Sequence, residues 1–260
     1  MNRLQTLMIA ASDKVAEIMQ QPSLRAARQQ GSRSNAKSFS QAAWQELERR
    51  QFVRAAYLAK MAIAFDPMWG DGYRALGLSY LRKGRPDLAR RTYTEGASVL
   101  PENGYIMSSL GDLEWDLKRY QEAEVAYRRA LELTPQHRDA QRLVVNLALS
   151  IYRQDRVDEA AVLLERERRR GANHVPLLLS LGEIRLHQKR DAEATVVFRE
   201  AIAQDPLVAQ AHYDLGYALQ RMGEWQSALP EIRRAIELDP NHADYPTALA
   251  QLEQGTQPTA

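Results

Sequence analysis

Residues 215–240 read LGYALQRMGEWQSALPEIRRAIELDP, and the outline of this stretch occurs three more times in the 260-residue chain. A Leu-Gly pair opens the outline, an Ala follows twelve residues after the Gly, and a Pro follows twenty-four residues after it. A fixed period near 34 residues is typical of stacked helical hairpins. The four copies are Leu76-Gly77 with Ala89 and Pro101, Leu110-Gly111 with Ala123 and Pro135, Leu181-Gly182 with Ala194 and Pro206, and Leu215-Gly216 with Ala228 and Pro240.

The outline extends over residues 36–242 and predicts six units, each made of two antiparallel helices and a short turn. Gly and Ala recur where the two helices must approach closely, and larger apolar residues recur where they fill the remaining volume. The predicted units are residues 36–69, 70–103, 104–137, 141–174, 175–208 and 209–242. Residues 243–260 are predicted to form a capping helix and a short tail.

The fourth unit departs from the outline. Three additional residues, 138–140, precede it, and its second helix ends in charged residues such as Glu167 and Arg168 where other units are apolar. Burying charge is unfavourable, so the sequence predicts a soft or kinked joint between the fourth and fifth units. Gly171 is predicted to end this helix in the left-handed conformation.

Residues 1–35 are predicted to form an N-terminal amphipathic helix and a linker. The helix would present an apolar stripe and end at Pro22, and the Ser/Arg/Gln-rich residues 29–34 would form the linker. The stripe has three possible roles: to cap the first unit, to dock on a partner or a second copy, or to lie on a membrane surface. It consists of Leu4, Leu7, Met8, Ala11, Val15, Ile18 and Met19.

Composition argues against several functional classes. Cysteine is absent, which excludes disulfides and thiolate chemistry, and 35 basic against 33 acidic residues give a net charge of +2 that does not favour nucleic acid. No apolar run is long enough for a membrane span or a signal peptide, so we expect a cytoplasmic protein. The five histidines lack metal-site spacing, and no phosphate-binding loop or nucleophile elbow is present. We therefore expect no enzymatic activity, no cofactor and no metal.

The second unit resembles the tetratricopeptide repeat (TPR) family. It carries the family's pattern as Tyr73, Leu76-Gly77, Tyr80, Ala89, Tyr93 and Pro101, and the resemblance extends from Ala36 to His242. It implies an all-α fold, an α-solenoid in which antiparallel helix pairs form a right-handed superhelix.

The resemblance also implies where a partner binds. In TPR arrays the first helix of each unit lines the concave face. Trp, Tyr and Arg are frequent at the family's binding positions in this chain, and these residues dominate protein interfaces. The candidate partner-binding residues are Trp44, Arg74, Leu78, Arg82, Tyr105, Asp112, Trp115, Arg142, Asn146, Tyr152, Arg153, Glu183, Tyr213, Tyr217 and Arg221, with Asp214 beside them.

These observations predict a non-enzymatic interaction scaffold or assembly factor that binds a partner peptide or helix in its concave groove. Two alternatives remain open: a structural protein that self-associates through its N-terminal helix, and an RNA-binding helical-repeat protein. The Lys and Asn set with which some TPR domains grip a chaperone's terminal carboxylate is not present at the corresponding positions. Contact with a membrane is expected to be indirect if it occurs.

Overall fold

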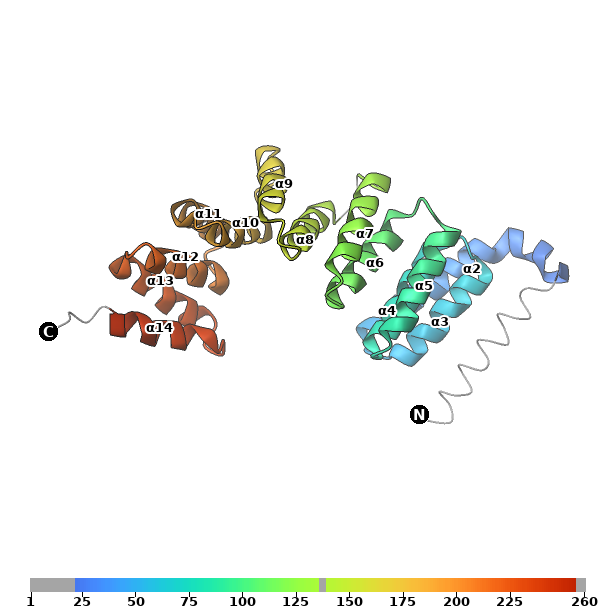
Figure 1. Cartoon of the computed structure of the whole chain (residues 1–260). Helices are drawn as coiled ribbons and strands as arrows, with labels where there is room; N and C mark the ends of the chain where they lie inside the picture. The colour runs from blue at the N-terminus through green and yellow to red at the C-terminus, as the bar shows by residue number, and fades with distance from the viewer. Residues whose placement is uncertain (1–21, 136–138, 256–260) are drawn as a thin grey trace. The chain divides into compact units, whose positions relative to one another are not determined.

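The structure is a computed structural model, and it describes residues 22–135 and 139–255. Over these residues it contains thirteen α-helices and no strand, which confirms the all-α prediction (Figure 1). The chain divides into two compact units, Met1–Ala140 (unit 1) and Gln141–Ala260 (unit 2).

Unit 1 contains three helix pairs. They are α2 (Pro22–Glu48) with α3 (Phe52–Phe65), α4 (Gly70–Arg82) with α5 (Pro86–Val99), and α6 (Gly104–Asp116) with α7 (Tyr120–Leu133). Pro86 opens α5 at a position where its missing N–H costs no hydrogen bond. The side chain of Asn103 caps α6 by accepting from the backbone N–H of Tyr105 and of Ile106, at 3.1 and 3.2 Å.

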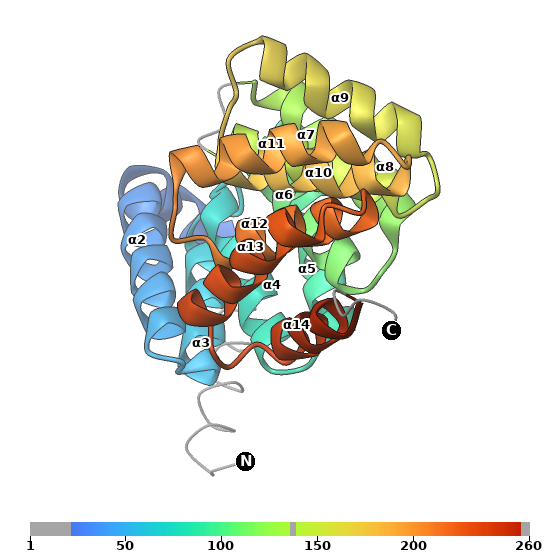
Figure 2. The same cartoon turned by 90° about the vertical axis from the view of Figure 1, so that its left-hand side faces the viewer.

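Unit 2 contains three further pairs and a single last helix. The pairs are α8 (Ala140–Tyr152) with α9 (Val157–Arg169), α10 (Val175–His187) with α11 (Asp191–Gln204), and α12 (Ala209–Arg221) with α13 (Trp225–Leu238). The last helix, α14 (Asp244–Gly255), packs on α13 (Figure 2). It lies in residues 243–260, for which the sequence predicts a capping helix and a short tail.

The turn inside each helix pair has the same backbone conformation. Gly84 and Gly223 have φ values of 69° and 79°, and four non-glycine residues at the equivalent position also have positive φ. A left-handed residue directly after a helix lets the last carbonyl groups accept hydrogen bonds from the turn. The four are Arg50, Lys118, Asp155 and Lys189.

Small residues allow the helices of a pair to pack closely. The Ala of each Leu-Gly outline, at positions 89, 123, 194 and 228, has no exposed surface. A Cβ atom on Gly182 would lie 2.2 Å from Cε1 of the buried Phe198, and one on Gly77 would lie 2.2 Å from Cε1 of Tyr93. The ring of the second helix therefore occupies the space that the glycine leaves on the first.

The N-terminal prediction needs a correction. Helix α2 runs without interruption from Pro22 to Glu48, so residues 29–34, predicted as a linker, are helical. The apolar stripe from Leu4 to Met19 lies outside the described residues.

The charged end of α9 is matched by charges on the helices of the next pair. Arg168 donates to Glu200 at 2.7 Å, and the buried Arg185 donates to Glu165 at 3.0 Å. These ion pairs compensate part of the desolvation of the charged helix end. The soft or kinked joint between the fourth and fifth pairs stays a prediction. Both pairs belong to unit 2, and the chain divides before the fourth pair, next to the additional residues 138–140.

Gly171 ends α9 as predicted. Its φ is 95°, its N–H donates to the carbonyl of Arg168 at 3.0 Å, and the N–H of Ala172 donates to the carbonyl of Glu167 at 3.1 Å. This pair of bonds is the Schellman motif that a left-handed glycine makes possible.

Candidate partner-binding surface

In unit 1, three consecutive first helices bring an arginine between two aromatic rings. Arg74 on α4 has its Cζ atom 5.4 Å from the ring centroid of Trp44 on α2 and 5.4 Å from that of Tyr105 on α6. Guanidinium groups stack favourably on aromatic faces. The sequence named all three residues, and the structure places them in contact.

Arg74 is also held by polar contacts. Its Nη1 donates to Asp71 at 2.9 Å, and its Nε donates to the hydroxyl of Ser109 at 3.4 Å. Only 15% of its side chain is exposed. The side chain is therefore fixed in position before any partner arrives.

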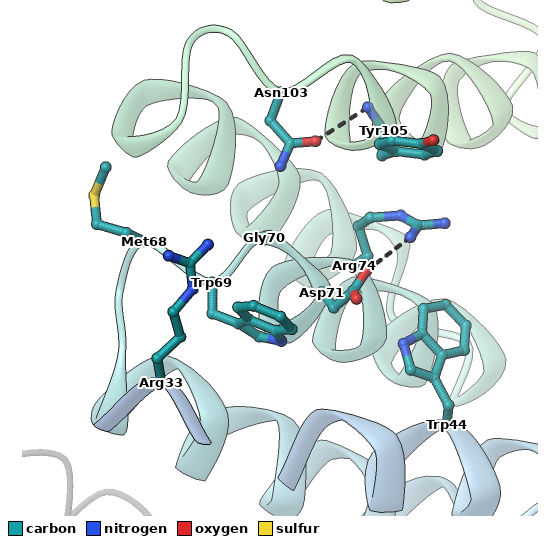
Figure 3. A pocket seen from close by; sticks show the side chains of 9 residues that line it. All are labelled: Arg33, Trp44, Met68, Trp69, Gly70, Asp71, Arg74, Asn103 and Tyr105. Atoms are coloured by element: carbon teal, nitrogen blue, oxygen red, sulfur yellow. Dashed lines mark hydrogen bonds and ion pairs between the residues drawn. The ribbon is translucent and has the colours of Figure 1, made fainter. Parts of the chain in front are cut away.

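These residues line a hollow of about 550 Å³, which we call the arginine hollow (Figure 3). The sequence analysis missed several members because they lie outside the family's binding positions. Trp69 belongs to the turn between α3 and α4, and Arg33 precedes the first predicted unit. The hollow is lined by Arg33, Trp44, Met68, Trp69, Gly70, Asp71, Arg74, Asn103 and Tyr105.

Some of the other candidate residues of unit 1 make contacts with the second helix of their own helix pair. Asp112 accepts a hydrogen bond from the hydroxyl of the buried Tyr127 at 2.8 Å. Trp115 packs edge-on against Tyr120, with 5.2 Å between the ring centroids. Leu78 is half-buried and Arg82 is exposed. Of these four candidates, Arg82 is the one that stands mainly in solvent.

In unit 2, one group of candidates gathers where α8 meets α10. Tyr152 packs edge-on against His187 at 5.4 Å, and Arg153 lies over the Tyr152 ring at 5.3 Å. Arg153 also pairs with Glu183 at 3.7 Å. His187 is an additional member that the sequence analysis did not name as a binding residue. Arg142 and Asn146 lie on α8, the helix that carries Tyr152.

A second group in unit 2 lies on α12. Tyr213 stacks on Tyr245 of α14 at 4.7 Å, and Arg221 lies over the Tyr217 ring at 5.9 Å. Arg221 pairs with Asp191 at 3.1 Å, so its position is fixed by the preceding helix pair. Tyr217 keeps 42% of its surface exposed and is available to a partner.

Asp214 lies in a smaller hollow of about 230 Å³, together with Glu183 and Gln210. Burial raises its pKa from 3.8 to about 7; the amide of Gln210, which donates to it at 2.7 Å, acts in the opposite direction, and the charge of Glu183 raises the pKa further. Asp214 therefore changes its charge near neutral pH.

Among residues 22–135 and 139–255, no group of His, Asp and Glu side chains is arranged to hold a metal ion. Within the same part of the chain, no helix combines the length and the apolar character that crossing a membrane requires. The first helices gather aromatic rings, guanidinium groups and carboxylates.

Family models support the repeat. A model of the tetratricopeptide repeat matches residues 74–138 and 145–209, and a second model of the same description matches residues 209–242. Together these segments cover more than half of the chain.

Several curated proteins share this region. Tetratricopeptide repeat protein 8 of Caenorhabditis elegans is 24% identical over 176 residues, which are 67% of this chain and 34% of that protein. A protein O-mannosyl-transferase of Homo sapiens is 26% identical over 168 residues, 64% of this chain and 16% of that protein. The type IV pilus assembly protein PilF of Pseudomonas aeruginosa is 23% identical over 160 residues, 61% of this chain and 62% of that protein. The chain thus spans about a third or less of the first two relatives.

Solved structures share the fold. The structure of Pseudomonas aeruginosa PilF superimposes with a TM-score of 0.72 at 18% identity, covering 85% of this chain and all of that one. The type IV pilus biogenesis factor PilW gives a TM-score of 0.72 at 17% identity, covering 82% of this chain and 98% of that one. At these identities the likeness concerns the fold alone.

Proposed function

Because the chain belongs to the tetratricopeptide repeat family, we propose that it is a non-enzymatic scaffold that binds a peptide or helix of a partner protein on its first-helix faces. The observation that carries this function is the ladder of Trp44, Arg74 and Tyr105, which is fixed within unit 1 and lines an open hollow. Interface energy concentrates in such aromatic and arginine anchors.

The second support is the repetition of this chemistry in unit 2. Tyr152 with Arg153 and Tyr217 with Arg221 again place a guanidinium over a tyrosine on a first helix. A chain that offers the same kind of anchor on several first helices suits an extended partner.

The relatives favour a role in assembly. The curated Pseudomonas aeruginosa relative is named a type IV pilus assembly protein, and a scaffold that brings partners together is consistent with that name. The human relative is named a transferase, but the shared segment is 16% of that protein. Its activity therefore lends little support to an enzymatic role for this chain.

Replacing Tyr105 and Tyr217 together with alanine is expected to weaken capture of the native partner by tenfold or more. Truncating an interface anchor costs about 2 kcal/mol, and about 1.4 kcal/mol is tenfold in affinity. The measurement is quantitative mass spectrometry of proteins that co-purify with the tagged chain from its native cells, with circular dichroism to verify that the helices remain.

The matched control replaces Val125 and Val162 with alanine. These side chains lie on the second helices α7 and α9, are 66% and 64% exposed, and do not line the arginine hollow, so their truncation removes apolar surface without changing the ladder of Trp44, Arg74 and Tyr105. Capture that is unchanged by the tyrosine variant, or lost equally in the valine variant, would place the binding surface elsewhere.

A further inference from the structure

We propose that the arginine hollow, which Arg33 and Arg74 both line, binds a carboxylate of the partner, so that unit 1 selects an acidic peptide. This inference rests on the proposed function and adds to it the chemical class of the partner. It also gives a role to the part of α2 that lies before the first repeat.

The hollow has the size and the charge for this ligand. Its volume of about 550 Å³ lies in the range of cavities that hold small ligands and extended side chains. Its lining contains two guanidinium groups and one carboxylate, and that carboxylate, Asp71, is engaged by Nη1 of Arg74 at 2.9 Å. The lining therefore carries a net positive charge.

Arg74 forms one fixed wall of the site. The rings of Trp44 and Tyr105 hold its guanidinium at 5.4 Å each, and Asp71 and Ser109 bind two of its nitrogens. Because the group is already ordered, an incoming carboxylate does not have to immobilise it.

Arg33 forms the opposite wall. Its Cζ atom lies 5.7 Å from the ring centroid of Trp69, and the indole Nε1 is itself fixed by donating to the hydroxyl of Ser40 at 2.8 Å. Within the described residues no carboxylate pairs with Arg33. A guanidinium that stacks on a ring keeps its N–H edge available for a planar acceptor. In the view of Figure 3, Trp69 lies between the two arginines.

Asn103 adds a neutral donor. Its Oδ1 accepts from the backbone of Tyr105 and Ile106, so the amide nitrogen is the group that it offers to the hollow. Gly70 preserves the space in front of that nitrogen, since a Cβ there would lie 2.3 Å from Asn103 Nδ2. Donors thus outnumber acceptors in the hollow, which favours an anionic ligand and disfavours a Lys or Arg side chain.

The test measures fluorescence anisotropy of the full chain with labelled peptides of alternating Glu and Leu that carry an amidated C-terminus. An isosteric peptide of Gln and Leu removes the side-chain carboxylates, and the same Gln peptide with a free C-terminus restores one carboxylate at the chain end. We expect the Glu peptide to bind at least about tenfold tighter than the amidated Gln peptide, in a salt-sensitive manner. A preference for the Gln peptide with the free C-terminus alone would contradict the selection of acidic side chains.

Arg33→Gln is expected to abolish most of that preference, measured as the ratio of the dissociation constants of the Glu peptide and the amidated Gln peptide. Arg234→Gln is the matched control, because Arg234 is exposed and pairs only with the neighbouring Glu237 among the described residues. Equal binding of all peptides, no measurable binding of any, or an Arg33→Gln variant that retains the full preference would overturn acid recognition. Capture of the native partner through Tyr105 and Tyr217 would still stand in that case, so the two proposals fail separately.

Discussion

Asp214→Asn is expected to make the chain more stable than the native sequence above pH 7 and equally stable near pH 4. Burial raises the pKa of Asp214 to about 7, so between pH 4 and 7 the folded state holds a proton that the unfolded state has released. Stability contributed by this group is therefore lost as the pH rises through 7. Asparagine keeps the acceptor for Gln210 without the charge.

The size of the effect follows from the pKa. A carboxyl whose pKa rises from 3.8 to about 7 lowers the stability by at most about 4 kcal/mol once it is ionised. Because relaxation and water entry reduce such penalties, we expect ~2–3 kcal/mol at pH 8. The measurement is urea denaturation at several pH values, followed by circular dichroism.

Glu237→Gln in the same unit is the control for this prediction. Its side chain is 65% exposed, and we expect a change in stability below about 0.5 kcal/mol at any pH. An Asp214→Asn variant that is less stable than the native chain at pH 8 would show that ionised Asp214 is stabilised by its surroundings.

Gly182→Ala and Phe198→Ala are each expected to be destabilising alone and to compensate each other partly when combined. The added methyl group would meet the Phe198 ring at 2.2 Å, and such overpacking costs about 1–3 kcal/mol. Removing the fully buried ring leaves a cavity and costs about 3–5 kcal/mol. In the double variant the methyl group enters the space that the ring has left, so the coupling free energy is expected to be about 1–2 kcal/mol.

Gly84→Ala provides the comparison for this cycle. A Cβ on Gly84 would have no atom within 4 Å, but its φ of 69° disfavours a side chain, so we expect about 1 kcal/mol of strain. The changes in the free energy of unfolding caused by Gly84→Ala and Phe198→Ala should be additive, because the two residues lie in different compact units. If the effects of Gly182→Ala and Phe198→Ala on stability are additive as well, the glycine and the ring do not compete for the same space.

The helix pairs could be predicted from the sequence because their signal is local and repeated. Four of the repeats carry a Leu-Gly pair, an Ala and a Pro at fixed distances. This pattern indicates a packing contact between the two helices of one pair, such as that of Gly182 with Phe198. The family's binding positions likewise identified Trp44, Arg74 and Tyr105, since the first helices α2, α4 and α6 end at the same point of the repeat.

The arginine hollow and the ion pairs of α9 could not be predicted, because they depend on contacts between neighbouring helix pairs. A repeat pattern does not encode such contacts. Arg33 lies in a polar stretch that lacks an apolar period, and only the continuation of α2 brings it over Trp69. The charged end of α9 looked unfavourable because its partners, Glu200 and Arg185, belong to the following pair. Charge complementarity at this distance along the chain becomes visible only when the helices are in place.

Binding of a partner on the first-helix faces is tested most directly by site-specific photo-crosslinking in the native cells. A benzophenone amino acid is placed at position 105 or 217 on the first helices, and at position 125 or 162 on the second helices as comparison. We predict that positions 105 and 217 crosslink to one partner protein and that positions 125 and 162 do not. Crosslinks to that partner from positions 125 and 162 alone would contradict a first-helix binding surface.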